Sequence, residues 1–314
     1  MKNIILLVVV VAFIISPTPH PPMFGVYVSP PSEIVTLNAQ LTTGRAVIGV
    51  EFIDVATLNI RGRLQQFTDM GVVPFINIMV GNLPKQCQDL FAINSGDCDA
   101  VINHFVNEFI AWGGRAYIVP FPEANGGWAS YGLQPDQYKA AYSRIRSAFI
   151  DRGVTQTHAL FVFAPNAWSE YGHEFEMYYP GSQEVDVVGL SFFSGSCSGG
   201  DYTTSDLYKN YLIRVRKMAG DKPVFLTQFG ADTNQTEFIS TFLPFLREWG
   251  IAGVLWFNGQ DGPCDYRIKN IGTLDAALYG YTTQPDWNKI FVAQRSQQFC
   301  RVIKGRTICL DISR

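Results

Sequence analysis

The sequence predicts a single-domain (β/α)8 barrel, and three observations support this fold: the number of strands, their apolar character and the helical segments between them. Eight short, almost wholly apolar runs recur along the chain, as expected for strands that are buried on both faces. They span residues 24–28, 46–52, 72–78, 116–121, 159–164, 185–192, 223–229 and 253–257. Eight strand–helix units over ~270 residues are typical of this barrel. An open doubly wound sheet is the alternative, but it normally carries a glycine-rich phosphate loop after its first strand. Here Ser-Pro-Pro-Ser-Glu follows Val28.

The helical segments are recognised by apolar residues at helical spacing and by the residues at their ends. We expect helices over residues 100–112, 135–151, 205–218 and 236–249. The first places its large apolar side chains on one face, and the second begins with a proline, which suits the first turn of a helix. Each follows one of the predicted strands, as the barrel requires.

The composition is that of a globular protein with a large core. Of the 314 residues, 47% are hydrophobic and 16% are charged, below the ~25% charged residues of an average globular chain, which excludes a disordered protein. The net charge is −3 and no long block of Lys and Arg occurs, so nucleic acid is not an expected partner. The four histidines are scattered and no cofactor motif is present, so we expect neither a metal nor a cofactor.

The N-terminus resembles a secretory signal. Lys2 precedes an unbroken apolar run that ends at Ile15, and Ser-Pro-Thr-Pro follows it. This run is shorter than the ~20 residues that span a membrane; an uncleaved anchor is the alternative. We therefore expect a secreted monomer that contacts no membrane beyond this segment. Its expected parts are a signal peptide or short anchor at 1–22, the barrel at 23–295 and a C-terminal extension at 296–314.

Six cysteines behind a secretory signal predict three disulfides. Fifteen pairings are possible for six cysteines. Short loops favour Cys87–Cys98 and Cys300–Cys309, and these two leave Cys197–Cys264. The Cys300–Cys309 pair would pin the C-terminal extension.

Amides and aromatic side chains gather where the predicted strands end, which is the position of the active site in a (β/α)8 barrel. Such a set suits a neutral polyhydroxylated ligand, because aromatic rings stack on the C–H faces of sugars and amides pair with hydroxyls. We expect the partner to be an oligo- or polysaccharide. The expected contacts are Glu51, Asn125, Trp128, Asn166, Trp168, Tyr179, Phe193, Trp256 and Asn258. The alternatives are an ion pair of Glu51 with Arg61 or Arg63 and core positions for the aromatic residues.

The most informative run is Val119–Trp128, which reads VPFPEANGGW. It places Glu123 at the end of a buried strand, where a carboxylate costs several kcal/mol unless it is paired. Such a residue is interpreted as a proton donor whose pKa is raised by burial. The alternative is a structural glutamate that a neighbouring Arg or Lys holds.

The segment PFPEANGGW resembles the strand-four signature of glycoside hydrolase family 26, the β-mannanase family in the clan of (β/α)8 retaining glycosidases. The resemblance extends in chain order to residues 164–166, 178–189, 222–230 and 253–267. It implies the hydrolysis of a β-linked mannan, glucan or xylan. It also implies that Glu123 is the acid/base and that residue 228 occupies the nucleophile position.

The chain departs from the family pattern at the nucleophile position, where Gln228 replaces Glu. Val119, Pro122 and the segment 191–193 also differ from the residues usual in the family. Retaining hydrolysis needs two carboxyl groups ~5–5.5 Å apart, and a neutral amide cannot form the glycosyl ester. Two interpretations therefore stay open: a secreted glycosidase, and a non-catalytic carbohydrate-binding barrel.

Three further carboxylates follow the last three predicted strands. Asp201, Asp232 and Asp261 are each candidates for a remote base. If the chain hydrolyses with inversion, another carboxylate must activate water at ~6.5–9.5 Å from Glu123.

Overall fold

The computed structural model describes residues 21–80, 87, 89–198, 207–284, 299–303 and 306–310, the last two ranges for the backbone alone. Its centre is a closed barrel of eight parallel strands that are hydrogen-bonded in chain order. The strands are β1 (Met23–Tyr27), β2 (Ala46–Asp54), β3 (Val73–Met79), β4 (Ala116–Pro120), β5 (Ala159–Phe163), β6 (Val187–Ser194), β7 (Val224–Ala231) and β8 (Gly253–Phe257). Because β1 pairs with both β2 and β8, the sheet has no edge. The predicted barrel is confirmed and the open doubly wound sheet is excluded.

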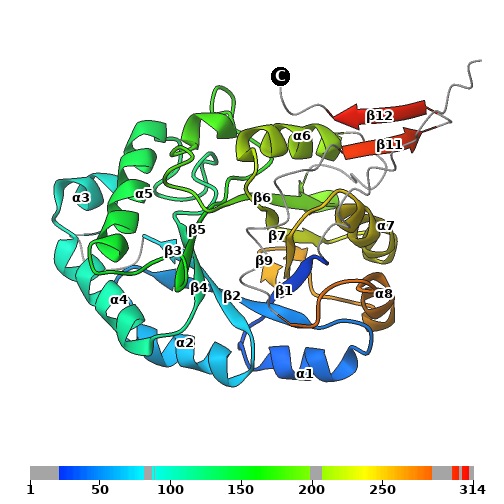
Figure 1. Cartoon of the computed structure of the whole chain (residues 1–314), viewed down its shortest axis with the longest axis horizontal. Helices are drawn as coiled ribbons and strands as arrows, with labels where there is room; N and C mark the ends of the chain where they lie inside the picture. Colours follow the sequence, from blue (N-terminus) through cyan, green and yellow to red (C-terminus); the bar gives the residue numbers. More distant parts are fainter. Residues whose placement is uncertain are drawn as a thin grey trace, which may run out of the picture.

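Helices surround the strands in Figure 1. They are α1 (Glu33–Gln40), α2 (Ile60–Asp69), α3 (Leu90–Ser95), α4 (Asp99–Trp112), α5 (Pro135–Ile150), α6 (Leu207–Ala219), α7 (Gln235–Glu248) and α8 (Ile271–Ala277). The four helices expected from the sequence correspond to α4, α5, α6 and α7. Among the helices that the structure describes, none is long and apolar enough to cross a membrane.

The expectation of eight strand–helix units is wrong for the fifth unit. The connection between β5 and β6 contains only the short 3-10 helix η1 (Phe175–Tyr178). Aromatic packing replaces an α-helix here: Phe175 and Tyr178 are fully buried. The ring of Tyr178 meets the ring of Tyr138 on α5 edge to face, with centroids 5.8 Å apart. Asn166 and Trp168, earlier in the same connection, line the cavity described below.

The core has two layers, one inside the barrel and one between the strands and the helices. The inner layer is apolar and comes from all eight strands; its members include Met23, Val50, Phe75, Tyr117, Leu160, Val187, Phe225 and Leu255. These side chains fill the barrel, as is usual for this fold. A ligand therefore binds at the mouth of the barrel and does not pass through it.

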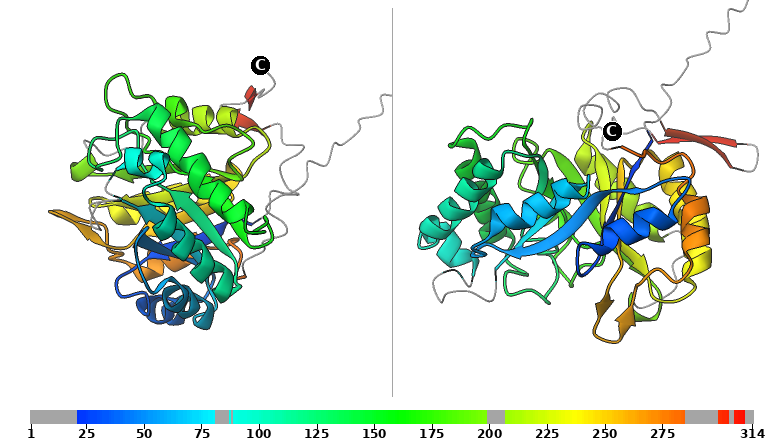
Figure 2. Two further views of the ribbon diagram at one scale, coloured as in Figure 1. Left: turned by 90° about the vertical axis from the view of Figure 1, so that its left-hand side faces the viewer. Right: turned by 90° about the horizontal axis from the view of Figure 1, so that it is seen from below.

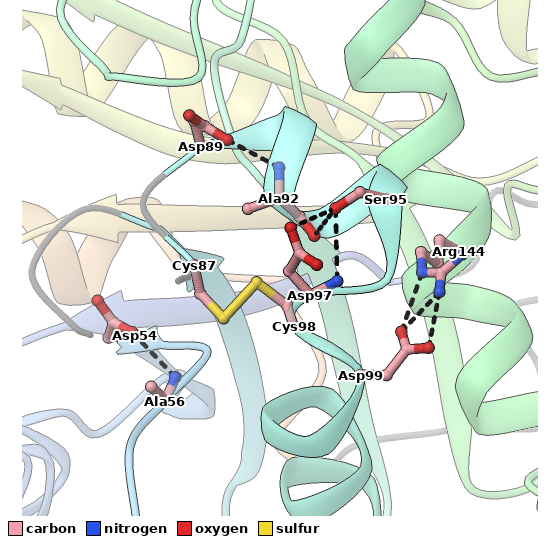
Figure 3. Close-up of a disulfide and its surroundings, with 10 residues drawn as sticks. All are labelled: Asp54, Ala56, Cys87, Asp89, Ala92, Ser95, Asp97, Cys98, Asp99 and Arg144. Carbon is pink, nitrogen blue, oxygen red and sulfur yellow. Dashed lines mark hydrogen bonds and ion pairs between the residues drawn. A yellow bond between two sulfur atoms is a disulfide. The ribbon is translucent and has the colours of Figure 1, made fainter. Parts of the chain in front are cut away.

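Two of the expected disulfides, Cys87–Cys98 and Cys197–Cys264, are present in the structure. Figure 3 shows the first beside α3, whose N-terminal Asp89 accepts a hydrogen bond from the Ala92 amide at 2.8 Å. Cys300 and Cys309 are paired residues of the two-stranded sheet of β11 (Phe299–Ile303) and β12 (Arg306–Leu310). Their side chains lie outside the described part of the chain, so this third disulfide stays a prediction. The expected signal segment lies almost wholly outside the described residues too.

A small hairpin follows β8. It pairs β9 (Gln260–Asp261) with β10 (Cys264–Asp265) in antiparallel fashion. Figure 2 shows it projecting from the barrel. Cys264 connects it to Cys197 in the 3-10 helix η2 (Ser196–Ser198), which follows β6.

Candidate active site

A cavity of about 1140 Å³ lies at the carboxyl-terminal ends of the strands. Its volume is at the upper end of the ~300–1,000 Å³ usual for ligand sites. The lining is mainly apolar and rich in aromatic side chains, and it includes Phe52, Met79, Glu123, Trp128, Tyr131, Asn166, Trp168, Phe193, Gln228, Phe257, Asp261 and Tyr266. The structure thus brings Glu123 and Gln228, which are far apart in sequence, to one cavity.

Glu123 lies in the turn after β4 in an uncommon backbone conformation. Its φ angle is 58°, in the left-handed region that few residues other than glycine adopt. The turn is held by its main chain: the Glu123 amide donates to the carbonyl of Ala164 at 2.8 Å, and the Gly126 amide donates to the carbonyl of Glu123 at 3.0 Å. Backbone strain of this kind costs about 1–3 kcal/mol and clusters at functional sites.

The carboxyl group of Glu123 is poorly solvated. Its Oε1 atom is shielded from solvent and makes no hydrogen bond of normal geometry with the described residues. Burial raises the pKa of Glu123, the polar side chains of Ser191, Asn166 and Trp128 offset part of that rise, and the charge of Asp261 adds to it.

A structural role for Glu123 would require a cation beside it. Within the described part of the chain, no Lys or Arg forms an ion pair with Glu123. A carboxyl group in this environment favours its protonated form, as a general acid must.

Gln228 lies on β7 and faces the same cavity. It is half-buried and aligned with Ser191 on the neighbouring β6. Its side-chain amide makes no hydrogen bond to any residue that the structure describes, and so it is available to a ligand. An amide can donate and accept hydrogen bonds, but it cannot act as the carboxylate nucleophile of a covalent glycosyl intermediate.

Two tryptophans form an exposed aromatic platform at the cavity. The side chains of Trp128 and Trp168 are 52% and 53% exposed. Their rings are stacked, with centroids 6.0 Å apart and an interplanar angle of 29°. The ring of Trp128 lies so close to Gly126 that an added Cβ would come within 2.1 Å of it. Glycine at this position therefore lets the platform form.

Asn125 does not line the cavity, contrary to the expected substrate contact. It is fully buried. Its Nδ2 donates to the carbonyls of Asn166 at 2.9 Å and Trp168 at 3.2 Å, and its Oδ1 accepts from the Asn166 amide at 2.8 Å. It therefore fixes the loop after β5, including Asn166 and Trp168, which do line the cavity.

Trp256 is a core residue and not a stacking platform. It is fully buried, and its Nε1 donates to the carbonyl of Tyr266 at 2.8 Å. Its ring packs on Phe229 with centroids 5.6 Å apart. Since side chains alternate along a strand, the next residue, Phe257, faces the cavity in its place.

Glu51 also points away from the cavity. It forms an ion pair with Arg63 of α2 at 2.7 Å, which is the alternative noted from the sequence. Strand alternation explains this, because its neighbours Val50 and Phe52 face the interior of the barrel. Burial raises the pKa of Glu51 and the charge of Arg63 opposes that effect.

Tyr179 and Asn258 are the other two expected contacts that the structure places outside the lining. The ring of Tyr179 packs on Phe163 with centroids 5.5 Å apart, on the outer face of β5. The Oδ1 atom of Asn258 accepts a hydrogen bond from the Ile268 amide at 2.6 Å and so holds the loop after β8. Phe193, by contrast, lines the cavity as expected.

Several lining residues were not singled out from the sequence. Tyr131 donates to the carbonyl of Pro122 at 2.9 Å and supports the turn that carries Glu123. Tyr266 follows the hairpin, and burial together with Asp232, Asp261 and Glu123 raises its pKa to about 12. The resemblance had marked the segment of Tyr266 without giving that residue a role.

A family model described as glycosyl hydrolase family 26 matches residues 117–233. This range begins in β4, ends after β7 and contains Glu123, Asn166 and Gln228. No curated protein matches the chain in sequence.

Solved structures of β-mannanases resemble the whole barrel. A family 26 β-mannanase from Bacteroides ovatus has a TM-score of 0.63 at 15% identity, over 88% of this chain and 94% of that one. The catalytic domain of an endo-β-1,4-mannanase from Bacillus sp. JAMB-750 has a TM-score of 0.63 at 17% identity, over 83% and 85%. A β-mannanase from a symbiotic protist of the termite Reticulitermes speratus, complexed with a gluco-manno-oligosaccharide, has a TM-score of 0.58 at 16% identity, over 87% and 91%. At these identities the likeness is one of fold.

Proposed function

We propose that this protein is a glycoside hydrolase of the family 26 type that acts on a β-linked mannan, with Glu123 as its general acid. The observation that carries the proposal is the environment of Glu123: a carboxyl group at the mouth of the barrel, with a raised pKa and with no cationic partner among the described residues. The family match over the same segment and the resemblance of the barrel to mannanases support the substrate class.

Cleavage of a glycosidic bond requires a proton on the departing oxygen. A protonated Glu123 supplies it, and general acid catalysis is typically worth ~10²–10⁴-fold in rate. The platform of Trp128 and Trp168 offers flat apolar faces to sugar rings. Gln228 and Asn166 supply amide groups that can pair with sugar hydroxyls.

The test compares two glutamates whose pKa values are both raised by burial. We expect wild type to hydrolyse β-1,4-mannohexaose. We expect Glu123→Gln to lower kcat by ~10²–10⁴-fold while Kd changes little. The amide keeps the shape of the carboxyl group but has no acidic proton to donate. The matched control is Glu51→Gln, which removes a carboxylate outside the cavity and leaves kcat unchanged. Equal activity of Glu123→Gln and wild type would contradict the assignment, and a preference for xylan or cellulose oligosaccharides would contradict the substrate class.

Gln228 favours a second candidate, a non-catalytic barrel that binds the same glycan. Under this function wild type binds mannohexaose without hydrolysing it. Gln228→Glu would then create hydrolysis with retention of configuration, because Gln and Glu differ only in the terminal group.

We further propose that the mature protein is secreted, with residues 1–22 as its signal or anchor and residues 296–314 as a separate extension. The two disulfides support an oxidising compartment. N-terminal sequencing of the exported protein tests this: a mature chain that begins near residue 23 is expected, and a chain that retains Met1 indicates an anchor.

A further inference from the structure

The position of Glu123 depends on the turn that carries it. Of the acidic residues that follow the last three strands, Asp201 lies outside the described residues. Asp232 accepts a hydrogen bond from the Ser196 hydroxyl at 2.6 Å, and Asp261 is exposed on β9. In the described part of the chain, neither of these two aspartates is hydrogen-bonded to Glu123. The restraints on Glu123 therefore come from the segment after β4.

That turn has a strained residue on each side of Pro122. Phe121 has a φ angle of 54° and Glu123 has one of 58°, so both lie in the left-handed region although neither is glycine. Such residues persist only where the surrounding structure over-determines them. Phe121 is fully buried, and its amide donates to the carbonyl of Ile78 at 2.9 Å. The side chain of Glu123 lines the cavity, so its backbone must be fixed in another way.

The peptide between Pro122 and Glu123 is fixed through both of its polar groups. Its N–H, on Glu123, donates to the carbonyl of Ala164 at 2.8 Å, and its C=O, on Pro122, accepts from the hydroxyl of Tyr131 at 2.9 Å. Rotation of a peptide changes the φ angle of the residue that follows it, and the orientation of the middle peptide separates turns with a positive φ there from turns with a negative one. The two hydrogen bonds therefore select the strained orientation of this peptide.

Tyr131 reaches the peptide because the loop after β4 folds back on itself. The Leu133 amide donates to the carbonyl of Ala124 at 2.9 Å. An added Cβ on Gly132 would lie 2.0 Å from the carbonyl oxygen of Gly126, so only glycine allows this close approach. The returning segment thus packs against the turn and brings Tyr131 to it.

The hydroxyl of Tyr131 is a stable donor. The residue is fully buried. Burial raises the pKa of Tyr131 and the charge of Glu123 adds to that rise, so the hydroxyl keeps its proton in neutral solution. Its ring packs on Phe121 with centroids 5.7 Å apart, and the Sδ atom of Met79 lies 3.2 Å from its hydroxyl. A thioether is a weak acceptor, so the carbonyl of Pro122 is the better partner.

We propose that the hydroxyl of Tyr131 is a positioning group for the proton donor, an inference that rests on the proposed function. By holding the Pro122 carbonyl, it keeps the following peptide in the orientation that directs Glu123 to the glycosidic oxygen. Without this hydrogen bond the peptide rotates in a share of the molecules, Glu123 adopts a negative φ angle, and its carboxyl group leaves the place from which it gives its proton. Tyr131 exchanges no proton with the substrate and acts through Glu123.

The test compares two buried tyrosines that each donate to a proline carbonyl of the same segment. Tyr131→Phe removes the hydroxyl and keeps the ring. We expect it to lower kcat/KM on β-1,4-mannohexaose by about tenfold, the change in population that one buried hydrogen bond supports. On 2,4-dinitrophenyl β-mannobioside, whose leaving group needs no proton, the loss should stay below about twofold. The control is Tyr138→Phe, whose lost hydroxyl lies 3.4 Å from the carbonyl of Pro120; both of its rates should stay near wild type.

Two further measurements exclude a general loss of structure. Tyr131→Phe and Tyr138→Phe each lose one buried hydroxyl, so we expect similar small decreases in Tm for the two variants. A crystal structure of Tyr131→Phe is expected to show the peptide between residues 122 and 123 rotated in part of the molecules, with a negative φ angle at Glu123.

The outcomes separate the two proposals. Equal losses of Tyr131→Phe on the two substrates would make the hydroxyl a general structural support and overturn its positioning role. Wild-type kinetics, or an unchanged turn in the crystal structure, would overturn it too. In each case the proposed function stands if Glu123→Gln still loses activity on mannohexaose alone. If wild type does not hydrolyse mannohexaose, or Glu123→Gln keeps full activity, the proposed function fails and the inference fails with it.

Discussion

The burial that suits Glu123 to act as a proton donor also lowers the stability of the native state at high pH. Its pKa is raised above the ordinary value of ~4.3, so the unfolded chain ionises at a lower pH than the native protein does. Below that ordinary pKa both states are protonated and no penalty exists. As pH rises through the native pKa, the native state must bury a charge that the unfolded state solvates, and stability is lost.

Glu123→Gln should therefore stabilise the protein more at pH 8 than at pH 4. A gain of ~1 kcal/mol corresponds to a rise in Tm of about 2–4 °C in a protein of this size class. Calorimetry of both proteins at the two pH values measures the difference. A variant that is less stable than wild type at pH 8 would show that the carboxylate is well accommodated and would contradict the role of burial.

The residue at position 228 determines whether a further negative charge lies in the cavity with Glu123. In Gln228→Glu a third carboxylate enters the cavity that Glu123 and Asp261 already line, and like charges raise the pKa of the remaining acid. We expect the high-pH limb of kcat/KM to move to higher pH in this variant. The pH profile of mannohexaose hydrolysis measures this shift. A limb that stays in place would mean that residues 123 and 228 do not interact.

At the scale of elements, the turn after β4 has a glycine where the ring of Trp128 needs space. The ring of Trp128 occupies the space above Gly126, whereas an added Cβ at Gly127 would meet its nearest neighbour at an ordinary 3.4 Å. Neither glycine has a positive φ angle, so alanine is compatible with both backbones.

Gly126→Ala should displace Trp128 and weaken mannohexaose binding by roughly tenfold, since an aromatic stacking contact is worth ~0.5–1.5 kcal/mol beyond buried area. Gly127→Ala is the matched control and should bind like wild type. Titration calorimetry gives both Kd values. Similar affinities for the two variants would remove the platform from the binding site.

The elements also show what the sequence could predict. Apolar runs located all eight strands because strands buried on both faces leave a clear signal. It was harder to predict which side chain of a strand faces the cavity. Trp256 lies in the core and Phe257 lines the cavity, although they are adjacent in the chain. For Asn125 and Asn258, a strand-end amide reads the same in sequence whether it contacts a sugar or a neighbouring loop. Loop hydrogen bonds decide between these roles, and they depend on distant residues.

At the scale of the whole molecule, the cavity is assembled from segments that only the closed barrel brings together. The hairpin that carries Asp261 illustrates the limit of sequence reasoning. Its place at the cavity follows from the closure of β1 on β8, and its anchoring follows from the Cys197–Cys264 disulfide. The closed barrel and the Cys197–Cys264 pairing were both predicted from the sequence, but the packing of the hairpin against the cavity was not, because it depends on contacts between residues far apart in the chain.

The two disulfides should contribute unequally to stability. They join cysteines 67 and 11 residues apart. In the chain-entropy model the longer loop is worth roughly 4 kcal/mol and the shorter roughly 3 kcal/mol. Serine at both Cys197 and Cys264 should therefore lower the free energy of unfolding more than serine at Cys87 and Cys98. It alone should also lower kcat, because Cys197 lines the cavity and the hairpin after β8 loses its covalent link to the segment after β6. Urea denaturation and mannohexaose turnover measure the two effects, and the reverse order in both would contradict this account of the hairpin.

The role of Glu123 as proton donor is tested most directly by leaving groups of different basicity. The measurement is kcat/KM of wild type and Glu123→Gln on mannohexaose and on 2,4-dinitrophenyl β-mannobioside, whose leaving group needs no proton. If Glu123 is the general acid, the variant loses ~10²–10⁴-fold on mannohexaose and less than about tenfold on the aryl glycoside. Equal losses on the two substrates would contradict the assignment.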